Sequence, residues 1–269
     1  MQSQWLRAGL LLTLLISAQA IAQVQPQVIT VPVSRPGEAI TVKISILSAR
    51  IEVIGEDRQD AVFEVSVAEG ARKIITPSGT QSLKSSAYSL EVEEEDNTIT
   101  VDTDWRANKV KVLARIPRKA DLELSTVNDG EIIVSNIEGK LWLENTNGPI
   151  TATGISGAVL ADAVNEDIKV SFDAMDANDA MSFSSVNGDL VLGMPANAGA
   201  ELHIDNAQGE IYSDFEVQVQ PSKPVVTRKN SRGGVEVRVE SVIVANVNGG
   251  GPVIKLKTLN GDIRIEKSK

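Results

Sequence analysis

The stretch SVNGDLVL, residues 185–192, has a near copy at residues 258–265, where the chain reads TLNGDIRI. In both, an Asn-Gly pair and an acid separate two short runs in which apolar and polar residues alternate. A catalytic loop normally occurs once in a chain, whereas a structural unit recurs as often as it is stacked. The two copies therefore indicate a repeated architecture rather than a repeated active site.

Six segments follow the template apolar, x, apolar, x, small, x, Asn, Gly, x, apolar, x, apolar. They are LELSTVNDGEIIV from Leu122, LWLENTNGPITA from Leu141, VLADAVNEDIKV from Val159, MSFSSVNGDLVL from Met181, LHIDNAQGEIYS from Leu202 and IKLKTLNGDIRI from Ile254. Three copies depart from the template: Asp129 is an extra residue in the first, Glu166 replaces Gly in the third, and Gln208 replaces Asn in the fifth. We expect wider or shifted corners at Glu166 and Gln208.

Alternation with period two predicts strands with one buried face. An Asn-Gly pair between two such runs predicts a tight turn, because both residues tolerate positive φ. The small residue two places before the Asn is expected on the inner face, where little room remains. The expected turn residues are Asn128, Gly130, Asn147, Gly148, Asn187, Gly188, Gly209, Asn260 and Gly261.

One repeat cannot bury its own apolar face, but stacked repeats can. The sequence therefore predicts an all-β fold, a β-solenoid or β-roll-like stack of short strands with Asn-Gly corners. Residues 122–269 are expected to form the stack, with five rungs up to about residue 213. An excursion over residues 214–251 is expected next, after which the sixth copy returns and closes the stack.

The region over residues 23–121 also alternates, but less regularly. Its strand-like segments are QVITVPV, EAITVKISIL, ARIEVIG, AVFEVSV, YSLEVEEE, NTITVDT and KVKVLARIP. We expect an irregular β-rich cap that continues into the first rung. No linker rich in Pro, Gly or Ser separates the two parts, so a single domain is predicted.

The first 22 residues have the layout of a secretory signal peptide. Arg7 precedes the apolar run over residues 8–16, and small residues follow at Ala18, Ala20 and Ala22. The alternative is a membrane anchor, but the run is shorter than the roughly 20 residues that a spanning helix needs. We expect an exported protein, in the periplasm or at the cell surface, with no transmembrane segment after cleavage.

Composition excludes several classes of site. Cysteine is absent, so disulfides and thiolate metal sites are excluded. The net charge of −10 argues against nucleic acid, which is bound through clustered Lys and Arg. The single histidine, His203, lies between two residues expected to face inward, so it is expected at the surface, and no G-x-S-x-G motif accompanies it. We expect no catalytic residue and no cofactor.

Three charged groups remain as candidate sites. The acids that follow the corner Gly, or Glu166 where it replaces Gly, would lie about 4.8 Å apart in a stack. They could form a weak Ca²⁺ stripe or a solvated corner that discourages aggregation. The acidic segment 173–179 resembles a polar loop more than an EF-hand. The basic run 228–232 is expected at a solvated loop tip, where it could dock an acidic polysaccharide or the chain's own acidic rungs. The stripe candidates are Glu131, Asp167, Asp189, Glu210 and Asp262.

The chain resembles the bacterial DUF4097 family, a group of β-strand-repeat proteins labelled adhesins. The resemblance rests on RIEVIG at residues 50–55, on KVLARIPRKADLELST at residues 111–126 and on the closing IKLKTLNGDIRIEK at residues 254–267, together with the serial Asn-Gly corners. It covers roughly residues 44–267. It implies a β-solenoid or roll-like fold and no shared catalytic residues.

Two functions from different classes remain open. The first is a non-enzymatic adhesin-like binding or scaffold module of the bacterial cell envelope, whose partner is an unknown protein or an envelope polymer. The second is a carbohydrate-active enzyme, a polysaccharide lyase or glycosidase, which needs two suitably separated carboxylates and an aromatic platform. Trp142 faces outward by parity and could stack on a sugar or pack under the next loop.

Overall fold

The computed structural model describes residues 26–67, 90–103, 110–128, 130–176, 178–221, 225–231, 234–240 and 242–268. Across these ranges the chain forms strands and turns and no helix, so the all-β prediction is confirmed. Accordingly, the described part holds no helix that could cross a membrane. The segment predicted as a signal peptide lies outside the described residues, as do Tyr88, Trp105 and Asp129.

The N-terminal region forms seven strands, one for each alternating segment of its sequence. They are β1 (Gln27–Pro32), β2 (Ile40–Ile46), β3 (Ala49–Glu56), β4 (Asp60–Val67), β5 (Leu90–Glu95), β6 (Thr98–Thr103) and β7 (Val110–Pro117).

The repeat copies form pairs of strands on either side of each Asn-Gly corner. The strands of residues 120–194 are β8 (Ala120–Thr126), β9 (Ile132–Ser135), β10 (Glu138–Asn145), β11 (Ile150–Ala163), β12 (Ile168–Met175), β13 (Met181–Asn187) and β14 (Leu190–Met194). The later strands are β15 (Ala200–Gln208), β16 (Ile211–Ser213), β17 (Val217–Gln220), β18 (Val225–Ser231), β19 (Gly234–Glu240), β20 (Ile243–Val247), β21 (Val253–Asn260) and β22 (Ile263–Lys267).

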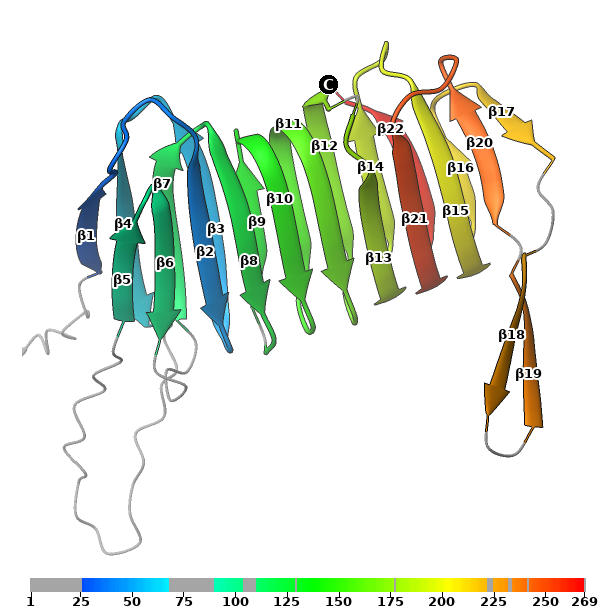
Figure 1. The fold of residues 1–269 in the computed structure, drawn as a ribbon, viewed down its shortest axis with the longest axis horizontal. Coiled ribbons are helices and arrows are strands. Elements are labelled where there is room, and N and C mark those ends of the chain that lie inside the picture. Colours follow the sequence, from blue (N-terminus) through cyan, green and yellow to red (C-terminus); the bar gives the residue numbers. More distant parts are fainter. Residues whose placement is uncertain are drawn as a thin grey trace, which may run out of the picture.

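Twenty of these strands join in one sheet, which folds into two facing layers (Figure 1). The first layer runs β5–β6–β2–β8–β10–β11–β13–β21–β15–β20–β17. The second runs β1–β4–β7–β3–β9–β11–β12–β14–β22–β16. β11 belongs to both, because residues 150–153 pair with β9 and residues 156–163 pair with β10.

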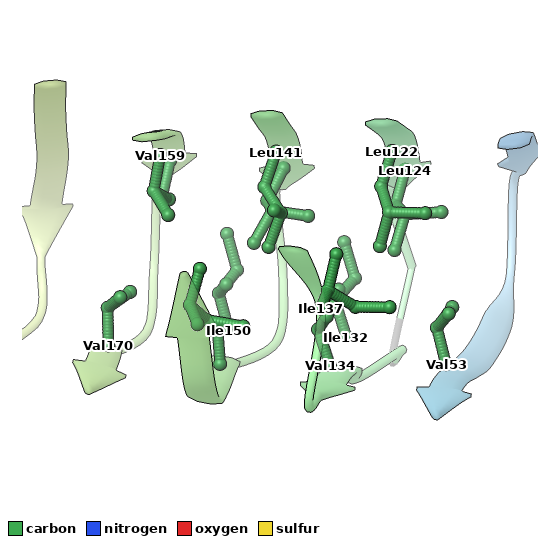
Figure 2. Packing of buried hydrophobic residues seen from close by; sticks show 14 of the residues in the cluster. Val53, Leu122, Leu124, Ile132, Val134, Ile137, Leu141, Ile150, Val159 and Val170 are labelled. Carbon is green, nitrogen blue, oxygen red and sulfur yellow. The ribbon is translucent and has the colours of Figure 1, made fainter. Parts of the chain in front are cut away.

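The core lies between the two layers. Within the repeats the strands of each layer are parallel and in register, so buried side chains from successive strands stack in rows. Leu122, Leu141 and Val159 of the first layer point toward Ile132 and Ile150 of the second (Figure 2). Each such side chain contributes about 1.5–3 kcal/mol when it is fully buried. Successive side chains of a strand point to opposite faces, so every second residue reaches this core and the sequence alternates between apolar and polar.

The order of the rungs differs from the prediction. A rung here is one strand of each layer joined by an Asn-Gly corner. The sixth copy, β21 and β22, pairs with β13 and β14 on one side and with β15 and β16 on the other. It lies between the fourth and fifth copies and does not close the stack. Its sequence is similar to those of the other copies, so its strands can pair with the strand edges of the fourth and fifth copies.

The excursion after the fifth copy is also more ordered than expected. β20 pairs antiparallel with β15 and with β17, so β17 is the last strand of the first layer. β18 and β19 form a separate antiparallel hairpin, which projects from the body (Figure 1). The first four residues of the basic run 228–232 therefore belong to strand β18 and not to a loop tip.

Candidate functional site

The corner asparagines form a hydrogen-bonded ladder along one edge of the stack. Asn165, Asn187 and Asn260 each donate from Nδ2 to Oδ1 of the asparagine of the preceding rung in space, over 2.7, 3.1 and 2.8 Å. At the head of the ladder, Asn147 Nδ2 donates to the carbonyl oxygen of Val127 at 3.0 Å. We call this set the asparagine ladder. Asparagine recurs at the corners because its side chain can both donate a hydrogen bond to one neighbouring rung and accept one from the other.

Positive φ does not explain the corners. Asn147, Asn187 and Asn260 are absent from the positive-φ residues of the described chain, and so are the three glycines that follow them. Of the predicted turn glycines, Gly209 has φ +146°. The glycines are required because the next rung lies so close. A Cβ at Gly148 would lie 1.6 Å from the carbonyl oxygen of Gly130.

A second set of polar side chains stands inside the corners. Thr126, Asn145, Ser185 and Thr258 are almost fully buried. Asn145 Nδ2 donates to Gly130 O at 3.0 Å, and Thr258 Oγ1 donates to Gly188 O at 3.0 Å. These bonds satisfy backbone oxygens that a buried corner would leave unpaired. The small residue expected on the inner face therefore joins neighbouring rungs as well as filling space.

The candidate calcium residues also lie along the corners. Asp167, Asp189 and Asp262 each accept a hydrogen bond from the backbone N–H of the adjacent rung, over 2.8, 2.8 and 3.0 Å. The bond from Glu210 N–H lowers the pKa of the Asp262 carboxyl, and Arg264 adds to the shift. The fifth candidate, Glu131, is paired with Arg50.

Four of the five candidate carboxylates thus already have partners within the protein, while Glu210 takes part through its backbone N–H. Among the described residues no group of three or more His, Asp or Glu is arranged to hold a metal ion. The Ca²⁺ stripe stays a hypothesis with a direct test. A rise in melting temperature with millimolar Ca²⁺, lost in Asp189→Asn, would support it, and unchanged melting together with no binding heat would end it.

Exposed aliphatic side chains lie beside the asparagine ladder. Each comes from the position directly before the corner Asn, or from the matching position in the β2–β3 connection. Neighbouring rungs place them side by side, with Thr146 interrupting the row. We call this set the corner stripe, and its members are Leu47, Val127, Val164, Val186 and Leu259. The template treats this position as variable, so sequence reasoning passed over it.

Trp142 stands on the outer surface of the first layer. Its side chain is 52% exposed, and its indole Nε1 donates to Glu144 Oε1 at 2.7 Å. Leu160, 42% exposed, is its register neighbour on β11. Two open hollows of about 360 and 370 Å³ flank the indole. The outward orientation expected for Trp142 is therefore present, and no loop buries it.

Charged residues surround Trp142 and are mostly paired. Lys43 Nζ lies 2.8 Å from Glu123, and Lys140 Nζ lies 2.7 Å from Asp179. The hydrogen bond that the Lys140 ammonium donates to Asp179 raises the pKa of Lys140. Sequence reasoning did not single out these residues. Counting in steps of two from Trp142, and matching the outward positions of neighbouring repeats, would have found Lys140, Glu144 and Glu123.

The other polar candidates do not assemble a catalytic constellation. His203 is about one-third exposed and is hydrogen-bonded to Glu201 at 2.6 Å. Glu144 and Asp162 are register neighbours and stand on the same face of one sheet. Desolvation raises the pKa of Asp162, and Glu144 adds to the shift. Sugar cleavage needs carboxylates that flank the scissile bond, whereas these two lie side by side.

The chain matches no family model and no curated protein. Three solved structures are similar over nearly the whole chain. A "putative cell adhesion protein" from Clostridium sporogenes ATCC 15579 is 8% identical, with a TM-score of 0.46, and the match covers 91% of this chain and all of that one.

The second, a "putative adhesin" from Bacteroides fragilis NCTC 9343, is 12% identical, with a TM-score of 0.40 and coverage of 90% and 98%. The third, a "putative lipid binding protein" from Parabacteroides distasonis ATCC 8503, is 11% identical, with a TM-score of 0.31 and coverage of 91% and 98%. Membership of the DUF4097 family stays a prediction.

Proposed function

We propose that this chain is a non-enzymatic, exported β-repeat module of the bacterial cell envelope, with an adhesin-like binding or scaffold role. Its architecture is that of a β-solenoid-like stack. Parallel, in-register rungs support this description, and so do the asparagine and carboxylate ladders that join them. A stack of this kind is rigid over its length, and it presents the same kind of side chain at regular intervals.

The corner stripe is the observation that supports a binding role most directly. Folding would normally bury aliphatic side chains such as Val164, Val186 and Leu259, yet these are 38–47% exposed. Contiguous exposed apolar groups rimmed by polar residues are typical of protein–protein contact sites. The asparagine ladder supplies such a polar rim. An extended partner lying along the stripe would contact several rungs at once.

The first experiment locates the protein. A C-terminal epitope tag, cell fractionation and protease shaving of intact cells would distinguish the two predicted locations, the periplasm and the cell surface. Loss of the tag on shaving indicates the cell surface, and protection in the periplasmic fraction indicates an envelope partner. Recovery in the cytoplasm alone would contradict export and, with it, this proposed function.

A second experiment tests the stripe. The purified chain is added to envelope fractions of the cells that make it, and retention is compared with that of a Val164→Lys/Val186→Lys double variant. Reduced retention of a folded variant supports binding through the stripe. The matched control is Ile133→Lys/Val191→Lys, which adds the same two charges at outward positions of β9 and β14 on the other layer. Equal retention of all three proteins would contradict the assignment of the stripe.

A further inference from the structure

Trp142 is held in place with its ring open to solvent. Its Nε1 is satisfied by Glu144, so the polar edge of the indole needs no further partner. The remaining apolar surface is half exposed and continues onto Leu160 of the next strand. An indole fixed in this way offers a preorganised flat surface to a ligand, and it loses little conformational freedom on binding.

The surface on either side of the indole is hollowed. One hollow, of about 360 Å³, lies over β8, β10 and β11. The other, of about 370 Å³, lies over β6, β2, β8 and β10. Both have Glu123 and Trp142 in their walls, so they meet at the indole. Each volume is within the range of small-ligand sites, and together they suit an elongated ligand that passes over Trp142.

Polar groups in these hollows are of the kinds that recognise hydroxyls. Glu123, Glu144 and Asp179 each have a partner, yet a carboxylate has about four acceptor positions and keeps free ones. The hydroxyls of Ser45 and Ser125 are 2.8 Å apart in the same wall. The site thus combines an aromatic and aliphatic floor with many acceptors and a few donors.

We propose that the outer face around Trp142 binds an oligosaccharide that carries no acidic groups. One sugar ring lies with its apolar face on the indole, and its neighbours occupy the two hollows. Sugar hydroxyls donate to Glu123 and Glu144 and accept from Lys43. The site does not use the corner stripe, which lies along a corner of the stack. It adds a ligand class to this chain whether or not the stripe binds a partner.

The charge of the hollows argues against acidic ligands. The hollows contain Asp121, Glu123, Glu144 and Asp179 against Lys43 and Lys140, so acids outnumber cations and an acidic polysaccharide would be repelled. An organic cation is the nearer competitor, because Glu144 accepts from a neutral indole N–H and Asp121 from a backbone N–H, and neither bond cancels the charge of the carboxylate. The extent of the surface favours the sugar, since two hollows that meet at the indole exceed what a compact cation would fill.

The test uses the full chain with Trp5→Phe and Trp105→Phe, so that Trp142 is the remaining tryptophan of three. Chitohexaose, cellohexaose and hexagalacturonate are titrated, with tryptophan fluorescence and calorimetry as readouts. We expect at least one neutral oligosaccharide to bind and to shift the Trp142 emission. Trp142→Ala should weaken calorimetric binding about tenfold or more, and Trp142→Phe should restore part of it.

Tyr212→Ala is the matched control. Tyr212 is 51% exposed on β16 of the other layer, with Arg264 over its ring, and its loss should leave the affinity unchanged. The proposal is overturned if neither neutral oligosaccharide binds, if hexagalacturonate binds best, or if Trp142→Ala binds as the parent does. Binding of tetramethylammonium without any sugar would assign the indole to a cation instead and would equally overturn it.

Discussion

Asn165 donates a hydrogen bond from Nδ2 to Oδ1 of Asn147 at 2.7 Å, although the two residues lie 18 positions apart in the chain. The same bond recurs one rung farther on, from Asn187 to Asn165. Each asparagine inside the ladder is therefore both donor and acceptor, and the corners depend on one another. Such chains of hydrogen bonds stabilise a structure cooperatively.

Replacement of an interior asparagine should destabilise the protein measurably. Asn187→Ala removes the bond to Asn165 and the bond from Asn260. At about 0.5–1.5 kcal/mol for each bond, we expect a loss of roughly 1–3 kcal/mol in the free energy of unfolding, measured in urea. Asn178→Ala, at an exposed loop position, is the control and should stay within about 0.5 kcal/mol of the parent. Equal effects would mean that the ladder adds no stability.

Gly148→Ala should be among the most damaging single changes in the described chain. The added Cβ would lie 1.6 Å from a backbone oxygen, which no side-chain rotation can relieve. We expect a loss of more than about 4 kcal/mol, the range of exceptional point mutations. Gly37→Ala is the comparison, because Gly37 has φ +90° with nothing near its missing Cβ. It should cost about 1–2 kcal/mol, so the reverse ranking in thermal melts would argue against close approach as the cause.

The strands were predictable because burial imposes a period of two on each rung, and that period is visible in segments such as ITVKISI at residues 40–46. The position of the last rung in the stack could not be predicted from the sequence. Ile254 and Leu202 begin copies with the same inward pattern, so alignment cannot tell which copy is whose neighbour. The cause of the corner glycines was also hidden, because close approach to the next rung involves residues far apart in sequence.

The candidate site was partly predictable. Parity gave the outward orientation of Trp142, since residues alternate along β10. The hollows beside it depend on Lys43 of β2 and on Asp179 of the loop before β13, and only the pairing of strands brings these to Trp142. The same holds for the corner stripe, whose members look like isolated variable positions until the rungs are stacked.

Asp162→Asn should stabilise the protein at neutral pH. Desolvation raises the pKa of Asp162 in the folded state above its ordinary value of 3.8, and the neighbouring Glu144 carboxylate adds to the shift. Folding therefore favours the protonated form, and the native state is penalised increasingly as pH rises through the raised pKa. The gain in melting temperature should be full near neutral pH and vanish below about pH 3.8.

Asp262→Asn should have the opposite effect on stability near neutral pH. The pKa of Asp262 is lowered, so its carboxylate contributes stability above its ordinary pKa and loses that contribution as pH falls through the lowered value. The variant should be less stable than the parent near neutral pH, and the difference should shrink in strong acid. Melting curves across pH for both variants check these signs, and parallel behaviour of the two would refute the assignments.

Removal of residues 253–269 should destroy more than the last rung. Without β21 and β22, the pair β13–β14 and the pair β15–β16 both lose a neighbour. We expect residues 200–247 to become sensitive to limited proteolysis. Deletion of residues 225–240 is the control, because in the described chain β18 and β19 pair only with each other. It should change the melting temperature by no more than roughly 2–4 °C. Protease resistance in the first variant would contradict the interior position of the last rung.

The interior place of β21 and β22 also sets when the molecule can be completed. A ribosome makes the chain from its N-terminus, so the fourth and fifth copies emerge before the strands that belong between them. If those two copies joined first, they would close the gap that the last residues must fill. Correct assembly therefore requires that the stack stop growing at β13 and β14 until synthesis ends. A nascent chain cut short by a premature stop keeps two bare strand edges, which proteases and chaperones can recognise as unfinished.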